Sequence, residues 1–139
     1  MFLEDCLILE NKNIAGQNYL MRLKAEKSIP VSKAGQFFMI QCKNKLHILR
    51  RTISLHYVDK NKMELEVYYE TKGGGTKEFS EMKAGETINI QGPLGHGFST
   101  DMTGKKLLVV GGGMGMAPMK LLVEILKKNN EVTFIAGGR

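Results

Sequence analysis

The feature that most constrains the fold is the stretch at residues 107–118, which reads Leu-Leu-Val-Val-Gly-Gly-Gly-Met-Gly-Met-Ala-Pro. A run of strand-forming apolar residues passes directly into a glycine turn, and the apolar spacing of residues 116–128 then fits a helix. Glycines allow a tight turn and let the backbone approach a phosphate, and the N–H groups that begin a helix attract the anion. The stretch therefore predicts a nucleotide-binding strand–turn–helix, with a dinucleotide or flavin as the first candidate ligand.

The residues before position 100 follow a different pattern. Short runs of strand-forming residues, several of them alternating between apolar and polar, are separated by turn residues such as glycine, proline and asparagine. We expect strands at residues 4–10, 19–26, 36–42, 49–58, 62–70 and 86–91. A short helix is expected at residues 76–82, with Thr76 as its N-cap. Six short strands with one small helix predict a closed antiparallel β-barrel domain over residues 1–99.

From residue 100 onward the pattern is typical of an α/β fold. A polar linker at residues 100–105 precedes the strand and the glycine turn, and a second strand-like run follows the helix at residues 131–136. This order predicts the first βαβ unit of a parallel, nucleotide-binding sheet. We interpret residues 100–139 as an incomplete domain of a truncated chain, because two parallel strands and one helix do not make a stable domain.

Composition excludes several classes of protein. The chain has 139 residues, 42% of them hydrophobic and 24% charged, which is the balance of a globular protein. Its net charge of +6 comes from Lys and Arg scattered among acids, so we expect no nucleic-acid partner. No apolar run is long enough to span a bilayer, and the N-terminus carries acids where a signal peptide has bases. We therefore predict a cytoplasmic protein without membrane contact.

The cysteines and histidines do not form a recognisable reactive centre. Cys6 and Cys42 lie far apart, each within an apolar run, and we interpret both as buried free thiols. The three histidines, at positions 47, 56 and 96, share no spacing typical of metal ligands or of a catalytic triad. We accordingly predict no metal ligand and no catalytic acid, base or nucleophile in this chain.

Three segments are candidate anion-binding sites. In the glycine turn, Met116 stands where the third glycine of a dinucleotide fingerprint would be, and the end of the second strand offers Arg139 as a candidate partner for a 2′-phosphate. Residues 73–76 (Gly-Gly-Gly-Thr) precede the short helix, and residues 50–54 (Arg-Arg-Thr-Ile-Ser) place two guanidiniums at the start of a strand. Taken singly, residues 73–76 are equally typical of a flexible loop, and the arginine pair at residues 50–51 is typical of surface charge.

Taken together and in order, the motifs resemble those of the ferredoxin–NADP reductase superfamily: Arg51-x-x-Ser54, Gly73-x-Gly-Thr76, a Gly-Pro-Leu-Gly-x-Gly-Phe segment at residues 92–98, and the glycine turn. Within that superfamily they are most similar to the electron-transfer subunits of dihydroorotate dehydrogenases. The resemblance implies a flavin-binding barrel followed by a nicotinamide-binding domain. The FAD site that it implies consists of Arg51, Thr52, Ile53, Ser54, Gly73, Gly74, Gly75 and Thr76. The nicotinamide nucleotide site that it implies consists of Gly111, Gly112, Gly113, Gly115 and Pro118.

The resemblance also implies an activity, namely electron transfer between NAD(H) and a partner through FAD and a [2Fe–2S] centre. Such a centre needs four thiolates in a tight pattern, so it is expected in a C-terminal region beyond residue 139. The expected partner is the FMN-containing catalytic subunit of a dihydroorotate dehydrogenase, in a hetero-oligomer that serves pyrimidine synthesis. Two alternatives stay open: a subunit that transfers electrons between NADPH and ferredoxin or a sulfur-linked acceptor, and a non-catalytic flavin-binding or docking fragment. Residues 1–139 by themselves are expected to be inactive.

Overall fold

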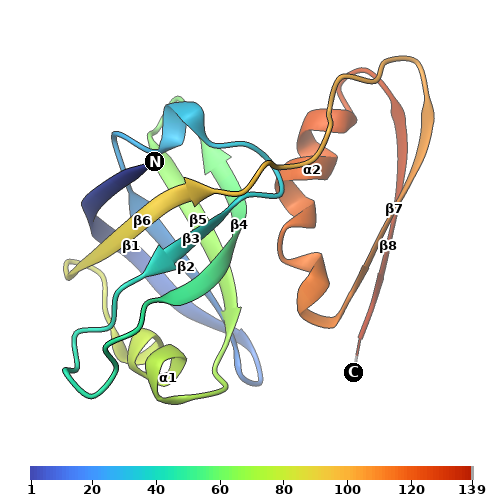
Figure 1. The fold of residues 1–139 in the computed structure, drawn as a ribbon. Helices are drawn as coiled ribbons and strands as arrows, with labels where there is room; N and C mark the ends of the chain where they lie inside the picture. The colour runs from blue at the N-terminus through green and yellow to red at the C-terminus, as the bar shows by residue number, and fades with distance from the viewer. Residues whose placement is uncertain (139) are drawn as a thin grey trace.

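The computed structural model describes residues 1–138, and Arg139, the candidate for a 2′-phosphate contact, lies outside the described residues. A β-barrel forms one part of the molecule, and a smaller unit of two strands and a helix lies beside it (Figure 1). Helix α2 of the smaller unit lies between the barrel and the two strands (Figure 1). No helix in this described range is long and apolar enough to cross a membrane.

Six antiparallel strands close the barrel in the order β1-β2-β5-β4-β3-β6, which confirms the predicted architecture. The strands are β1 (Phe2–Ala15), β2 (Asn18–Lys24), β3 (Phe37–Ile40), β4 (Arg51–Asp59), β5 (Glu64–Glu70) and β6 (Thr87–Leu94), with a 3₁₀ turn η1 (Ile29–Val31) between β2 and β3. Each predicted strand is present. The first strand is longer than the expected residues 4–10, because β1 continues to Ala15, paired with β2, and the chain reverses at Gly16, whose φ is 55°.

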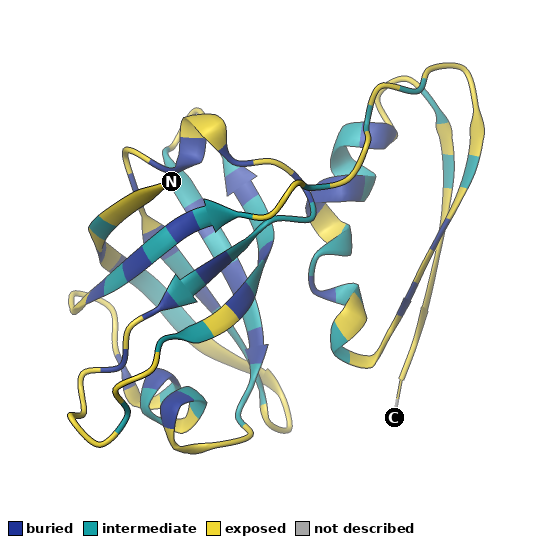
Figure 2. Ribbon diagram, in the orientation of Figure 1, coloured by how far each residue is buried: buried dark blue, intermediate teal, exposed yellow. Residues whose placement is uncertain are grey.

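Alternation places one side of each strand in the barrel core. In β5, Leu65, Val67 and Tyr69 are buried, while the intervening residues are partly exposed. Residues of all six strands belong to one hydrophobic core cluster. Figure 2 shows buried and less buried residues alternating along the barrel strands. The acidic face of β5 is partly covered, since Glu66 contacts Lys120 of α2.

Helix α1 (Gly74–Glu81) closes one end of the barrel (Figure 1). Its Phe79 is buried in the core, edge-on to the ring of Tyr69, and Asn11 of β1 donates hydrogen bonds to the carbonyl oxygens of Phe79 and Met82. The helix begins earlier than expected. The N-cap is Gly73, and the predicted cap Thr76 lies inside the first turn, so that assignment is wrong.

The smaller unit has the predicted βαβ order. Strand β7 (Lys106–Gly112) leads through a 3₁₀ turn η2 (Gly113–Met116) into α2 (Met119–Leu126), and β8 (Glu131–Gly137) returns parallel to β7. Helix α2 buries Leu121, Leu122 and Leu126. Figure 2 colours most of β7 and β8 as exposed, and Leu108, Val110 and Ile135 are each more than half exposed.

Candidate flavin and nucleotide site

The two adjacent arginines at the start of β4, Arg50 and Arg51, point to opposite sides of the strand. Arg50 Nη2 donates a hydrogen bond of 2.6 Å to Asn89 Oδ1 on β6, and Nη1 of the same residue lies 3.3 Å from the carbonyl oxygen of Met39. Arg51 Nη1 instead bonds the carbonyl oxygen of Leu49 and its side chain lies against α1. Because successive residues of a strand point to opposite faces, only Arg51 is available to the α1 side. Arg50 is a structural residue of the barrel.

The N-terminus of α1 is open to an anion. Its first hydrogen bond joins the N–H of Lys77 to the carbonyl oxygen of Gly73, so the N–H groups of residues 74–76 have no acceptor within the helix. Thr76 Oγ1 accepts hydrogen bonds from the N–H groups of Lys72 (2.9 Å) and Gly73 (3.2 Å), which orders the approach to the helix.

Two of the glycines in this segment lie close against neighbouring side chains. A Cβ at Gly75 would lie 2.9 Å from Arg51 Cζ, and a Cβ at Gly74 would lie 2.6 Å from His47 Nε2. At Gly73 a Cβ would meet open space. Residues 74 and 75 are therefore not a flexible loop: their missing side chains let Arg51 and His47 lie directly against the first turn of the helix.

The glycine turn packs in a similar way. A Cβ at Gly111 would lie 2.9 Å from Met116 Cα, and Gly113 has a φ of 53°, a conformation that side-chain-bearing residues rarely adopt. At Gly112 and Gly115 a Cβ would meet open space. Pro118 is the N-cap of α2. The turn therefore needs glycine at positions 111 and 113, and leaves the backbone of the other two bare.

A cavity of about 260 Å³ is lined by residues of both the barrel and the glycine turn. Its walls come from the start of β4, the end of β5, the entry to α1 and the glycine turn. The lining residues are Thr52, Ile53, Ser54, Tyr68, Tyr69, Glu70, Lys72, Thr76, Met114 and Ala117. The predicted residues 52–54 and Thr76 are thus brought into one site, with Arg51 and the α1 N-terminus beside it. The predicted residues 111–113, Gly115 and Pro118 belong to the turn whose Met114 and Ala117 form the far wall.

The sequence did not single out Tyr68, Met114 and Ala117 as wall residues. Tyr68 had a signal, because it is an aromatic residue on the outward-facing side of an alternating strand, between glutamates. For Met114 and Ala117 there was no signal in the sequence other than their position in the glycine turn. Tyr69, although it borders the cavity, is 2% exposed and donates its hydroxyl hydrogen to Asn11 Oδ1.

A second cavity, of about 330 Å³ and with largely apolar walls, lies between α2, β8 and the barrel. It shares Tyr68 and Ala117 with the first cavity, and His56, Lys120 and Phe134 also border it. Burial is the main cause that lowers the pKa of His56 and nearby Lys120 lowers it further, against the opposing effects of the Ala117 carbonyl and of Glu66. His56 is therefore held as a neutral imidazole at neutral pH.

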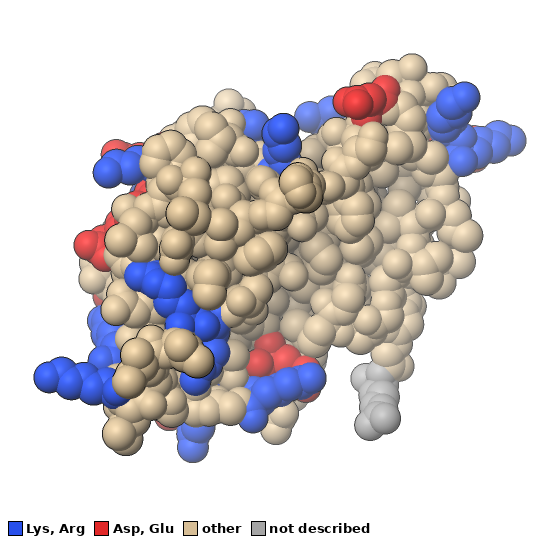
Figure 3. All heavy atoms as spheres, viewed as in Figure 1, with Lys and Arg blue, Asp and Glu red and all other residues tan. Residues whose placement is uncertain are grey.

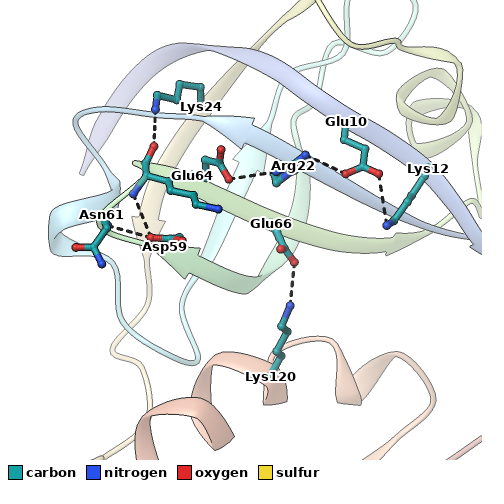
Figure 4. Close-up of polar contacts among 10 residues, drawn as sticks. Glu10, Lys12, Arg22, Lys24, Asp59, Asn61, Glu64, Glu66 and Lys120 are labelled. Carbon is teal, nitrogen blue, oxygen red and sulfur yellow. Dashed lines mark hydrogen bonds and ion pairs between the residues drawn. The ribbon is translucent and has the colours of Figure 1, made fainter.

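The charges of the molecule are spread rather than concentrated. Figure 3 shows Lys and Arg side chains at several separate places on the visible face. Some basic residues pair with acids, as Arg22 does with Glu10 and Glu64 on the barrel wall (Figure 4). Within residues 1–138 there is no cluster of three or more His, Cys, Asp or Glu side chains that could hold a metal ion. Both cysteines are buried and free, as predicted.

The fold and the arrangement of the cavity define a class of protein. The chain belongs to the family of oxidoreductase FAD-binding domains, whose pattern matches residues 6–98, the whole length of the barrel beyond the first residues of β1. FAD is therefore the cofactor that this family membership supports.

Particular relatives narrow the comparison. The chain is 36% identical to the electron transfer subunit of dihydroorotate dehydrogenase B (NAD(+)) of Geobacillus sp. (strain WCH70), over 96% of this chain and 54% of the relative. It is 39% identical to the subunit of the same name from Caldanaerobacter subterraneus subsp. tengcongensis, over 86% of this chain and 46% of the relative. The chain thus spans about half the length of the curated relatives that it matches.

A solved structure confirms the fold relationship. The chain superposes on the NADH-dependent reduced ferredoxin-NADP oxidoreductase with a TM-score of 0.88 at 25% sequence identity, over 96% of this chain and 48% of that one. The resemblance to the ferredoxin–NADP reductase superfamily, first noted from four short motifs, is confirmed by relatives that match nearly the whole chain.

The residues present fit FAD. A pyrophosphate needs cationic and N–H donors at close range, and the Arg51 guanidinium and the first turn of α1 provide both next to the cavity. Tyr68 gives the cavity an aromatic wall for a flat ring, and Thr52 and Ser54 offer hydroxyls.

Proposed function

We propose that this protein is an electron-transfer flavoprotein subunit that passes electrons between a nicotinamide nucleotide and a partner protein. The observation that carries the proposal is the single cavity in which the β4 motif, the α1 N-terminus and the glycine turn meet. Membership of the FAD-binding family and the names of the curated relatives support it. When bound, FAD supplies the chemistry: it exchanges a hydride with a nicotinamide and releases electrons one at a time.

The chain's own residues then bind and orient the cofactor. Arg51 and the N–H groups of residues 74–76 hold the pyrophosphate, since Gly75 lets the guanidinium and the helix terminus approach the same point. Thr52, Ile53 and Ser54 line the ring-binding wall. The protein needs no acid or base for this reaction, and its contribution is the relative position of two cofactors and the exclusion of water between them.

We further propose that residues 1–99 are the flavin-binding domain and that residues 100–139 begin the nicotinamide-binding domain. The parallel β7–β8 pair and the glycine turn at its carboxyl edge support this division, because nucleotides bind at that edge of parallel sheets. Gly111, Gly112, Gly113, Gly115 and Pro118 are then the residues that shape the nicotinamide nucleotide site.

The proposed partner is the FMN-containing catalytic subunit of a dihydroorotate dehydrogenase, in a hetero-oligomer of pyrimidine synthesis. The names of the relatives support this choice. A [2Fe–2S] centre, carried outside residues 1–139, would link the two flavins. The ferredoxin-NADP oxidoreductase relationship supports a second candidate, in which the electron acceptor is a ferredoxin or a sulfur-linked compound.

One preparation tests the proposal. The protein is purified at its full natural length, its visible spectrum is recorded, and the flavin released on denaturation is identified. We expect flavin absorbance from FAD and anaerobic bleaching on addition of NADH. Addition of a dihydroorotate-oxidising subunit distinguishes the two candidates, since only the first predicts NAD⁺ reduction that depends on dihydroorotate. A protein that carries no flavin and cannot be reconstituted with FAD would end the proposal.

A further inference from the structure

His56 connects the barrel to the glycine turn by a direct hydrogen bond. Its Nδ1 lies 2.6 Å from the carbonyl oxygen of Ala117, a residue 61 positions later in the chain. A carbonyl oxygen can only accept, so Nδ1 carries the hydrogen and Nε2 is left without one in the neutral ring. Among the described residues, this is the one side-chain hydrogen bond that reaches the backbone of residues 111–118.

The position of His56 on its strand links the bond to the flavin cavity. His56 follows Ser54 by two residues in β4, so the two side chains project from the same face of the strand. Ser54 lines the first cavity and His56 the second. A shift of β4 or of the turn would therefore change the hydrogen bond and the cavity wall together.

Ala117 and Tyr68 form the partition between the two cavities, since both residues line each of them. Ala117 is 2% exposed, and the His56 ring lies 5.5 Å from the Tyr68 ring, centroid to centroid, at an interplanar angle of 31°. His56 therefore contacts both residues of the partition, Ala117 through the hydrogen bond and Tyr68 through its ring. Burial of the imidazole keeps it neutral, which preserves the Nδ1–H donor at neutral pH.

Two neighbouring contacts of Lys120 join helix α2 to the barrel but do not involve the glycine turn. Lys120 Nζ lies 3.3 Å from Glu66 Oε2 and 4.6 Å from the centre of the Tyr57 ring (Figure 4 draws the ion pair). Both contacts use the partly exposed end of a long, flexible side chain. Neither contact reaches the backbone of the turn, whereas the His56 hydrogen bond does.

We propose that His56 is a positioning residue, which through Ala117 sets the distance and angle between the nicotinamide turn and the flavin cavity. This inference rests on the proposed function. It assigns a role to a residue that lies outside the cofactor motifs of the sequence but contacts one of them at Ala117. Its physical basis is that transfer between two bound groups falls steeply with misplacement, by about a hundredfold for an error of ~1 Å.

The test compares three variants of the protein at its full natural length. His56→Leu removes the donor, His56→Gln retains an N–H donor that can reach the carbonyl, and Glu4→Ala is a control for lost stability. Glu4 accepts hydrogen bonds from the backbone N–H groups of Glu26 and Ser28, away from both cavities. The measurements are FAD content, the thermal midpoint, the flavin absorbance change on titration with NAD⁺, and the rate of anaerobic flavin reduction at saturating NADH.

For His56→Leu we expect FAD content to stay at the wild-type level, the NAD⁺-induced absorbance change to shrink, and the saturated rate of flavin reduction to fall by about ten- to a hundredfold. His56→Gln should restore most of both signals, and Glu4→Ala should lower the thermal midpoint and leave both unchanged. A wild-type rate and absorbance change in His56→Leu would overturn the inference, as would equal losses in Glu4→Ala. A wild-type protein that holds no FAD would instead refute the proposed function.

Discussion

The guanidinium of Arg51 lies directly on the backbone of Gly75, so close that a Cβ on that glycine would be 2.9 Å from Arg51 Cζ. The contact joins the start of β4 to the first turn of α1, and the two residues are 24 positions apart in the sequence. It places a fixed positive charge at the end of a helix where N–H groups are also free. The pair is the structural core of the proposed pyrophosphate site.

Replacement of Gly75 by alanine should separate stability from flavin binding. The new methyl group displaces Arg51, while alanine favours the helix over glycine by about 1 kcal/mol and offsets part of the strain. We expect little change in the thermal midpoint and a loss of about tenfold or more in FAD affinity, since a hydrogen bond to a charged group contributes about 1.5–3 kcal/mol. Quenching of flavin fluorescence measures the affinity. Gly73→Ala, where a Cβ meets open space, should retain much more of it.

The two adjacent arginines should respond in opposite ways. Arg51→Ala should weaken FAD binding by about ten- to a hundredfold with a small loss of stability, because its partner is the cofactor. Arg50→Ala should mainly lower stability, because it leaves Asn89 Oδ1 without its donor. Chemical denaturation and FAD titration of both variants check this. Equal losses of FAD affinity in the two would contradict the assignment of Arg50 to the barrel.

Acid should destabilise the protein through His56. Burial is the first cause that lowers the pKa of this imidazole from its ordinary value of 6.5, so the unfolded chain binds a proton that the folded chain resists. The stability is therefore present above pH ~6.5 and is lost as the pH falls below that value. Urea unfolding at pH 7.5, 6.5 and 5.5 measures the effect, and His56→Gln should flatten the curve over this interval. A slope unchanged in the variant would exclude His56 as its source.

A second acidic transition should appear at lower pH. Burial tends to raise the pKa of Glu4, but the hydrogen bonds from residues 26–28 outweigh it and lower the pKa from 4.5. Glu4 thus stabilises the fold above that pH, and its contribution disappears as the pH falls through the folded-state value. In Glu4→Gln this part of the pH dependence should be reduced, while the part between pH 7.5 and 5.5 should remain.

The Cys6 thiol should be inert while the barrel is folded. It is 0% exposed, and burial, with smaller contributions from Glu4 and Asp5, raises its pKa to about 12. Since the thiolate is the reactive form, alkylation with iodoacetamide at pH 8 should leave Cys6 unmodified in the native protein and modify it fully in denaturant. Mass spectrometry of the Cys6 peptide distinguishes the two states. Rapid native labelling would mean that β1 and β6 separate readily.

The interface between α2 and the barrel should depend only weakly on its ion pair. Lys120 and Glu66 are 3.3 Å apart, and the Lys120 side chain is 42% exposed. A double-mutant cycle with Lys120→Met and Glu66→Gln should give a coupling energy of about 0.2–1 kcal/mol that decreases with salt. A coupling several times larger would indicate that the pair, rather than the buried leucines of α2, holds the two parts together.

Local patterns in the sequence were sufficient for the elements and for the class of fold. Alternation in residues such as Leu65, Val67 and Tyr69 predicted a strand with one buried face, and the order of strands and glycine turns predicted a barrel followed by a βαβ unit. The motifs likewise singled out residues 51–54 and 73–76 as candidate cofactor-binding segments. These signals are local, because side-chain period and turn chemistry depend on near neighbours.

The tertiary structure alone decided which residues meet. The barrel order sets β4 beside β5, and the packing of α2 on β4 brings the glycine turn to the same place, so Tyr68, Ala117 and His56 come together from distant positions. It also separated Arg50 from Arg51 and moved Thr76 from the cap into the first turn of α1. The physical reason is that strand pairing and helix packing are non-local. The sequence by itself determined the strands and helices and their order, whereas the closure of the barrel and the packing of α2 on β4 determined which residues form the candidate site.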